Sequence, residues 1–156
     1  LLFPLEGLGM GLEYSPGPKL GWHLDTAADL EKLRPLNEAL EALQFQRTAM
    51  KLTRERLPVD KSLIGFVGGP WTLFTYASQG AHDGSLIGAK KRLSLFAPFC
   101  DKLVPLLIEN IRLQLEGGPE VVMIFDTAAG ELSPEATRIL LAFHASGAFE
   151  STVVLG

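Results

Sequence analysis

The sequence predicts an α/β fold in which a parallel sheet is covered by helices. Two short apolar segments, residues 62–67 and 120–125, are bounded by turn residues and have the length of buried strands. Each segment continues into a glycine-bearing loop and then into a helix that opens with a proline, Pro70 or Pro134. Apolar strands that alternate with helices are typical of parallel sheets with helices packed on their faces.

The first 22 residues are expected to be mostly loop, because glycine and proline occur throughout them. Residues 1–6 resemble the end of a strand, and a short extended piece is expected around residues 12–14. The glycine-rich run at residues 7–11 does not match the dinucleotide-binding fingerprint, which needs a glycine where this chain has Leu12. We therefore expect no nucleotide site there.

Two helices are predicted between the first loop and the first strand. Thr26 and Asp29 have the pattern of an N-terminal cap for a short helix over residues 27–33. Pro35 is expected to begin a second helix, which Pro58 ends. This second helix keeps one apolar face over about six turns. The residues of that face are Leu36, Leu40, Leu43, Met50 and Leu57.

The connection between the two strands is long and helical. Helices are predicted over residues 70–78 and 86–96, and a long one begins at Pro98 and ends before the Gly-Gly-Pro sequence at residues 117–119. One side of the long helix is apolar and carries Leu103, Leu107, Ile111 and Leu115. After the second strand, we expect a loop, a helix over residues 134–145 and a third strand near residues 151–155.

Composition and charge narrow the class of protein. The 156 residues suffice for one domain with a hydrophobic core, and 47% are hydrophobic while 21% are charged. A net charge of −4 without a basic face argues against nucleic-acid binding, and no apolar run approaches the roughly 20 residues of a membrane span. The single cysteine, Cys100, has no metal-ligand spacing and is expected to be buried and inert. We expect a cytoplasmic protein that binds no metal.

The first candidate site is the turn Gly68-Gly69-Pro70, which follows the first strand. Glycines let a ligand approach the backbone, and the free N–H groups of the next helix could face an anion. Tyr76, nearly two turns into that helix, could lend a hydroxyl group. In the alternative interpretation, the glycines only make a tight turn and Tyr76 only packs in the core.

The second candidate site is the pair Asp126 and Thr127, which follows the second strand directly. A carboxylate and a hydroxyl at the carboxyl end of a strand are typical of α/β active sites. Alternatively, Asp126 only caps the loop at residues 127–131. The three histidines, at positions 23, 82 and 144, are scattered and predict no catalytic set.

Three stretches of the chain resemble the uroporphyrinogen decarboxylase family. The most specific is residues 63–76, Leu-Ile-Gly-Phe-Val-Gly-Gly-Pro-Trp-Thr-Leu-Phe-Thr-Tyr, followed by Gly80. Residues 124–132 resemble the family's second strand-end motif, and residues 4–12 with Gly17-Pro18 are similar to the stretch after its first site loop. Their order and spacing agree from residue 1 to about residue 135.

The resemblance implies a (β/α)8 barrel that acts as a homodimer. Residues 1–156 would then be part of one such barrel domain, about half of it, since a barrel typically needs about 250 residues. The implied reaction uses no cofactor. It converts the four acetate side chains of uroporphyrinogen III, an anionic tetrapyrrole, into methyl groups, giving coproporphyrinogen III and carbon dioxide for heme synthesis.

The resemblance also assigns roles to individual residues. Tyr76 and Thr127 match residues that hydrogen-bond substrate side chains, and Phe66 matches an apolar wall of the cleft. Asp126 has a supporting role, together with Gly68 and Gly69. The family's arginine motif, essential aspartate and late Gly-His motif have no counterpart among these residues, and Ala128 replaces a bulkier residue. No catalytic residue is therefore assigned within this chain.

Two other functions fit part of the pattern. One is a methyltransferase of the same fold, acting on a corrinoid or a thiol, which would use zinc held by histidine and cysteine. The chain has no His-x-Cys pair, and Cys100 is predicted to lie on a helix. The other is a non-catalytic relative that binds a tetrapyrrole or a partner. Arginines and an aspartate upstream of residue 1 would exclude the non-catalytic relative.

Overall fold

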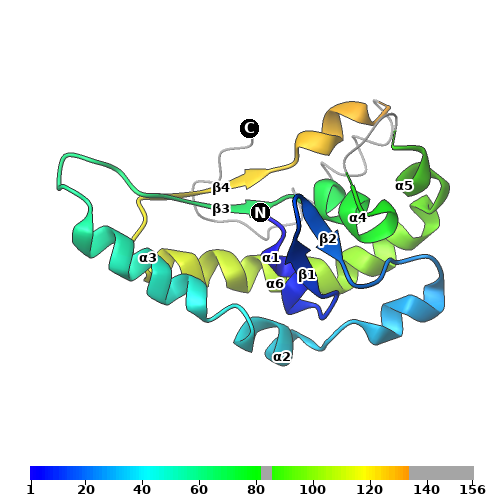
Figure 1. Ribbon diagram of the computed structural model, residues 1–156, viewed down its shortest axis with the longest axis horizontal. Coiled ribbons are helices and arrows are strands. Elements are labelled where there is room, and N and C mark those ends of the chain that lie inside the picture. The colour runs from blue at the N-terminus through cyan, green and yellow to red at the C-terminus, as the bar shows by residue number, and fades with distance from the viewer. Residues whose placement is uncertain (82–85, 134–156) are drawn as a thin grey trace.

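The computed structural model describes residues 1–81 and 86–133, and these form a mixed α/β structure. Its centre is a parallel pair of strands, β3 (Ile64–Gly68) and β4 (Val121–Phe125), which runs along the long helix α6 (Phe96–Glu116) (Figure 1). The register pairs Ile64 with Val121 and Gly68 with Phe125. Both predicted strands and their parallel arrangement are confirmed.

One face of the strand pair is sealed and the other is open. Val67, Val122 and Ile124 are buried on the face that packs on α6. On the opposite face, Ile64 is 51% exposed and Phe66 is 46% exposed. The prediction that the strands are buried throughout is therefore wrong for one face, because in the described part of the chain the long helix covers only the other face.

The edge of β3 that faces away from β4 is held by a side chain. The Phe66 N–H donates to Gln114 Oε1 at 3.0 Å, and Gln114 Nε2 donates to the Phe66 carbonyl at 3.2 Å. Two residues further along the same edge of β3, the Gly68 N–H donates to the Leu1 carbonyl at 3.1 Å. The amide of Gln114 thus takes the place that a neighbouring strand would occupy.

The N-terminal segment is more ordered than predicted. It consists of helix α1 (Phe3–Gly7) and an antiparallel hairpin of β1 (Leu12–Tyr14) and β2 (Pro18–Leu20). The expectation of a strand end at residues 1–6 is wrong, because proline in the first turn favours a helix there and the apolar residues recur every three positions. Those apolar residues are Leu2, Leu5 and Leu8, and all of them are buried.

Residues 27–56 form one 3-10 helix and two α-helices. Ala27–Lys32 is a 3-10 helix, and the Asp29 carboxylate accepts the Thr26 N–H at 2.7 Å, as the cap pattern predicted. The single long helix expected next is wrong: α2 (Leu36–Glu41) and α3 (Phe45–Arg56) are separate. The break lets α2 pack on both α1 and α6 while α3 runs along α6, and the fully buried Leu43 lies within the break.

The helices between the two strands follow the prediction in outline. Helix α4 (Pro70–Gln79) is confirmed, whereas residues 86–96 form only a short α5 (Ile87–Lys91) and a 3-10 turn (Leu93–Leu95). Helix α6 begins two residues before Pro98, since proline is tolerated in the first turn of a helix. Its predicted apolar side is buried except at Leu115.

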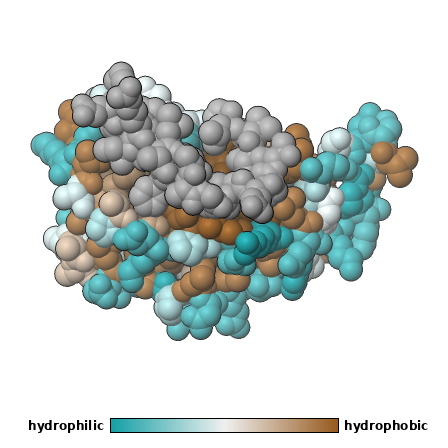
Figure 2. Space-filling view, turned by 180° about the vertical axis from the view of Figure 1, so that it is seen from behind, coloured by the Kyte–Doolittle hydropathy of each residue, from teal (hydrophilic) through white to brown (hydrophobic). Residues whose placement is uncertain are grey.

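The hydrophobic core lies between α4 and α6. Its aromatic part is a chain of ring contacts, with centroids 5.2–5.7 Å apart, that joins Trp71, Phe74, Phe96 and Phe99. The turn between α3 and β3, which contains the fully exposed Val59, projects from the body of the molecule (Figures 1 and 2). The helix and strand predicted over residues 134–145 and 151–155 lie outside the described residues.

Candidate functional site

The carboxyl ends of the two parallel strands meet at one end of the sheet. Figure 1 shows that both strand arrows point to the end where α4 and the 3-10 helix Thr127–Glu131 begin. Beyond the last strand pair, the Gly69 N–H donates to the Phe125 carbonyl at 2.8 Å, so the two loops continue side by side. In α/β folds, binding and catalytic groups gather at this end of the sheet.

Asp126 caps the N-terminus of α4. Its carboxylate accepts the Thr72 N–H at 2.6 Å and the Trp71 N–H at 3.2 Å. A negative side chain is favourable there, because the first N–H groups of a helix have no partner within the helix. The predicted anion site at these N–H groups is therefore already filled by the chain itself. The alternative that Asp126 caps a structure is correct in kind, but its side chain caps α4 and not residues 127–131.

Gly69 is required by the closeness of these two loops. A Cβ atom at position 69 would clash with the Asp126 side chain. The backbone of the first loop and the carboxylate of the second loop therefore pack directly against each other. This explains physically why the turn contains a glycine at this position, independently of any ligand.

Thr72 is a site residue to which sequence reasoning gave no role. Its Oγ1 accepts the Ala128 N–H at 3.1 Å, and both residues are buried. The signal was present in the sequence: a hydroxyl residue in the first turn of an apolar helix, between Trp71 and Leu73. Its partner could not be inferred, because it lies 56 positions away in the chain.

Thr127 and Phe66 present side chains at the surface of the described structure. Thr127 is exposed and directly follows Asp126. The ring of Phe66 lies edge-on to that of Phe125, with centroids 6.0 Å apart, on the open face of the sheet. Phe66 and Phe125 thus place two aromatic rings on the open face, and Thr127 lies two residues beyond Phe125.

Tyr76 lies one helical turn beyond Thr72 on α4. It is half-buried and packs against the hydrophobic core. Among the described residues, no hydrogen bond or ring contact joins its side chain to Phe66, Asp126 or Thr127. Five of the six predicted site residues thus lie on the two strands or in the loops directly after them. They are Phe66, Gly68, Gly69, Asp126 and Thr127. The sixth, Tyr76, lies further along the chain, on α4.

The surroundings of Cys100 disfavour its thiolate form. Burial, with a smaller contribution from the carboxylates of Asp101 and Asp126, raises the pKa of the Cys100 thiol to about 12. The thiol is protonated at neutral pH, whereas zinc binds the thiolate. Within residues 1–81 and 86–133, no three side chains of the metal-binding types are grouped closely enough to hold an ion. Of the histidines, His23 is exposed, and positions 82 and 144 lie outside the described residues.

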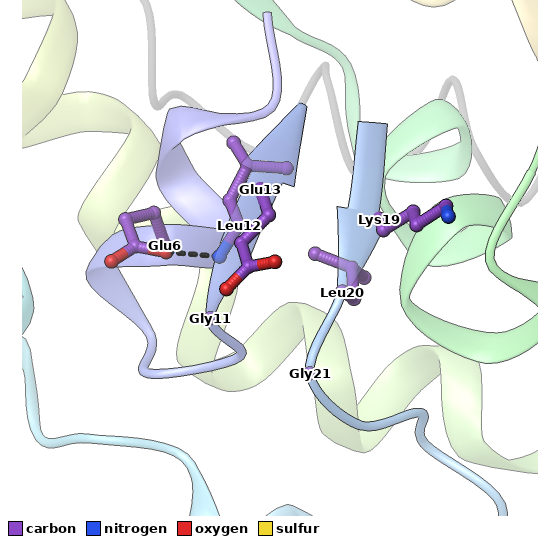
Figure 3. A pocket seen from close by; sticks show the side chains of 7 residues that line it. All are labelled: Glu6, Gly11, Leu12, Glu13, Lys19, Leu20 and Gly21. Atoms are coloured by element: carbon purple, nitrogen blue, oxygen red, sulfur yellow. Dashed lines mark hydrogen bonds between the residues drawn. The ribbon is translucent and has the colours of Figure 1, made fainter. Parts of the chain in front are cut away.

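Two surface hollows lie outside this strand-end constellation. One, of about 490 Å³, touches the site at Trp71 and is lined otherwise by Lys90, Leu93, Glu131, Leu132 and Ser133. The other, of about 400 Å³, lies between α1 and the β1–β2 hairpin, where the Glu6 carboxylate accepts the Leu12 N–H (Figure 3). Glu13 and Lys19 line that hollow from the two strands of the hairpin (Figure 3). None of the predicted site residues lines either hollow.

The described helices contain no segment that is both long and apolar enough to cross a bilayer.

Comparison with known proteins identifies the family. The model of the family described as uroporphyrinogen decarboxylase (URO-D) matches residues 1–145. The chain is 39% identical over 142 residues to a protein named uroporphyrinogen decarboxylase from Helicobacter pylori (strain Shi470), covering 87% of this chain and 41% of that protein. A protein of the same name from Campylobacter hominis gives the same figures.

A more distant relative agrees with these two. The protein named uroporphyrinogen decarboxylase from Microcystis aeruginosa is 33% identical over 141 residues, which cover 86% of this chain and 40% of that protein. The chain thus spans about two-fifths of the length of the curated relatives that it matches. Because the family match includes both strands and both loops of the site, the chain belongs to the uroporphyrinogen decarboxylase family.

Proposed function

We propose that the natural protein containing this chain decarboxylates uroporphyrinogen III to coproporphyrinogen III. In each of four steps, the bond between an acetate methylene and its carboxyl carbon breaks, carbon dioxide leaves, and a proton takes its place. The observation that carries the proposal is the family match over residues 1–145, which includes both strand-end motifs. We further propose that the chain forms part of a (β/α)8 barrel, which acts as a homodimer in the cytoplasm.

The proposed reaction depends on the positioning of the substrate and of acidic groups, and it needs no strong nucleophile. Protonation of a pyrrole carbon creates a cation that accepts the electrons released when carbon dioxide departs. A protein catalyses this step by holding the anionic substrate, orienting an acid and stabilising the cation with a carboxylate. We assign no catalytic residue within residues 1–156, and we propose that other parts of the natural protein supply the acid and the carboxylate.

The residues of this chain would bind and shape the substrate cleft. We propose that the Thr127 and Tyr76 hydroxyls donate to substrate carboxylates and that Phe66 forms an apolar wall against the macrocycle. The exposure of both Thr127 and Phe66 supports this assignment. Asp126 and Gly69 would support the cleft by fixing the loops. Gly68, which pairs with Phe125 at the end of the sheet, would support the cleft in the same way, because a Cβ atom there would meet Leu73 and the Leu1 carbonyl.

The intact mass of the purified natural protein, followed by an activity assay, tests the proposal. A mass well above 16.9 kDa would show that residues outside this chain are present. The protein is then incubated without oxygen with uroporphyrinogen III, and the products are separated by their number of carboxyl groups. We expect intermediates with seven, six and five carboxyl groups and finally coproporphyrinogen III. Tight binding of the substrate without loss of carbon dioxide would instead indicate a non-catalytic tetrapyrrole-binding relative.

A further inference from the structure

The two strand-end loops hold each other through a reciprocal set of hydrogen bonds. The loop after β4 gives a side chain, Asp126, to the backbone N–H groups of Trp71 and Thr72. The helix after β3 gives a side chain in return, because Thr72 Oγ1 accepts the Ala128 N–H. We call this set, made by Asp126, Trp71, Thr72 and Ala128, the loop latch.

The loop latch is buried and leaves little room for adjustment. Thr72 is 1% exposed and Ala128 is fully buried. Gly69 packs so closely on Asp126 that a Cβ atom would not fit, and its N–H is bonded to the Phe125 carbonyl. A buried N–H that loses its partner cannot bond to water instead, so the Ala128 N–H depends strongly on the Thr72 hydroxyl.

Thr127 lies between the two residues through which its loop is latched. The residue before it, Asp126, is fixed by its side chain, and the residue after it, Ala128, is fixed by its backbone N–H. Thr127 itself is exposed. Its backbone is therefore pinned on both sides while its hydroxyl remains available to a ligand.

We infer that Thr72, acting through the loop latch, is a positioning residue that fixes the Thr127 hydroxyl for a substrate carboxylate. This role of Thr127 rests on the proposed function. The carboxylate of Asp126 already occupies the N-terminus of α4, so those N–H groups are not available to a substrate carboxylate. A preorganised donor such as the Thr127 hydroxyl reduces the entropy cost of binding.

The first experiment measures the latch without using activity. Amide hydrogen exchange over residues 126–131 is compared in the natural protein, Thr72→Val, Thr72→Ser and Thr75→Val. Valine keeps the shape of threonine but leaves the Ala128 N–H without an acceptor. We therefore expect amide exchange of residues 126–131 to be about tenfold faster in Thr72→Val. Serine keeps the hydroxyl and should restore slow exchange. Thr75→Val is the matched control, because the Thr75 hydroxyl is buried on the same helix and, among the described residues, donates only to the Trp71 carbonyl, at 2.9 Å.

The second experiment is a double-mutant cycle on turnover of uroporphyrinogen III. We expect Thr72→Val to lower kcat/KM about tenfold in the natural background and to have little further effect in Thr127→Ala. Equal losses in both backgrounds would overturn positioning through Thr127, and unchanged exchange in Thr72→Val would overturn the latch. If the natural protein shows no turnover at all, the proposed function fails, and the exchange data alone then decide whether the latch holds the loop.

Discussion

The two faces of the β3–β4 pair carry similar apolar residues but have opposite surroundings. On the sealed face, Val67, Val122 and Ile124 are at most 3% exposed and pack on α6. On the open face, Ile64 and Phe66 are about half exposed. The difference teaches that apolar composition alone does not distinguish a face that packs in the core from a face that is left open among the described residues.

The largest expected effect comes from the sealed face. Ile124→Ala should lower the free energy of unfolding by about 3 kcal/mol, because it removes buried methyl groups and leaves a cavity against α6. Urea unfolding of the natural protein measures the change, and an equal slope for mutant and parent would show that stability alone has changed. A loss below about 1 kcal/mol would contradict the burial of this face.

The matched substitution on the open face sharpens the comparison. If the proposed barrel closes around this face, Ile64→Ala should cost about 2 kcal/mol in the natural protein, close to the value for Ile124→Ala. If Ile64 is as exposed in the natural protein as it is in the described structure, the loss of stability should stay below about 1 kcal/mol. The same urea titration therefore tests the barrel, and we expect the larger value.

Much of the sheet could be predicted from the sequence. The apolar composition and length of residues 62–67 and 120–125, with turn residues on both sides, predicted both strands, and Pro70 correctly marked the start of a helix. The break between α2 and α3 could not be predicted, because the apolar spacing continues across it and tertiary packing on α1 and α6 decides it. The helical start of the chain was missed because Pro4 was interpreted only as a loop residue.

The candidate site was predictable in its residues but not in its connections. The position of Asp126 after a strand indicated a site, yet its partners on α4 are 54 and 55 positions away. The role of Thr72 was hidden for the same reason. Long-range hydrogen bonds leave no periodic signal in one sequence, whereas strand ends and helix caps do.

The cap on α4 gives the next effect in size. Asp126→Ala removes the acceptor for two N–H groups at the start of the helix, so we expect a loss of about 1–2 kcal/mol in stability. Asp126→Asn keeps one acceptor oxygen and is the matched control, with a smaller expected loss. Thermal unfolding of the three proteins at neutral pH measures the series. An Ala variant as stable as the parent would show that the N–H groups find other partners.

The smallest effect should appear on the open face at Phe66. Phe66→Leu preserves an apolar side chain but shortens the wall, so stability should change by less than about 1 kcal/mol. If the open face lines the substrate cleft, the KM for uroporphyrinogen should rise about threefold, because part of an apolar contact with the macrocycle is lost. Val67→Ala on the sealed face provides the contrast: it should lower stability with little change in KM. Reversed results for these two variants would mean that the cleft lies on the other side of the sheet, and the assignment of Phe66 would then be wrong.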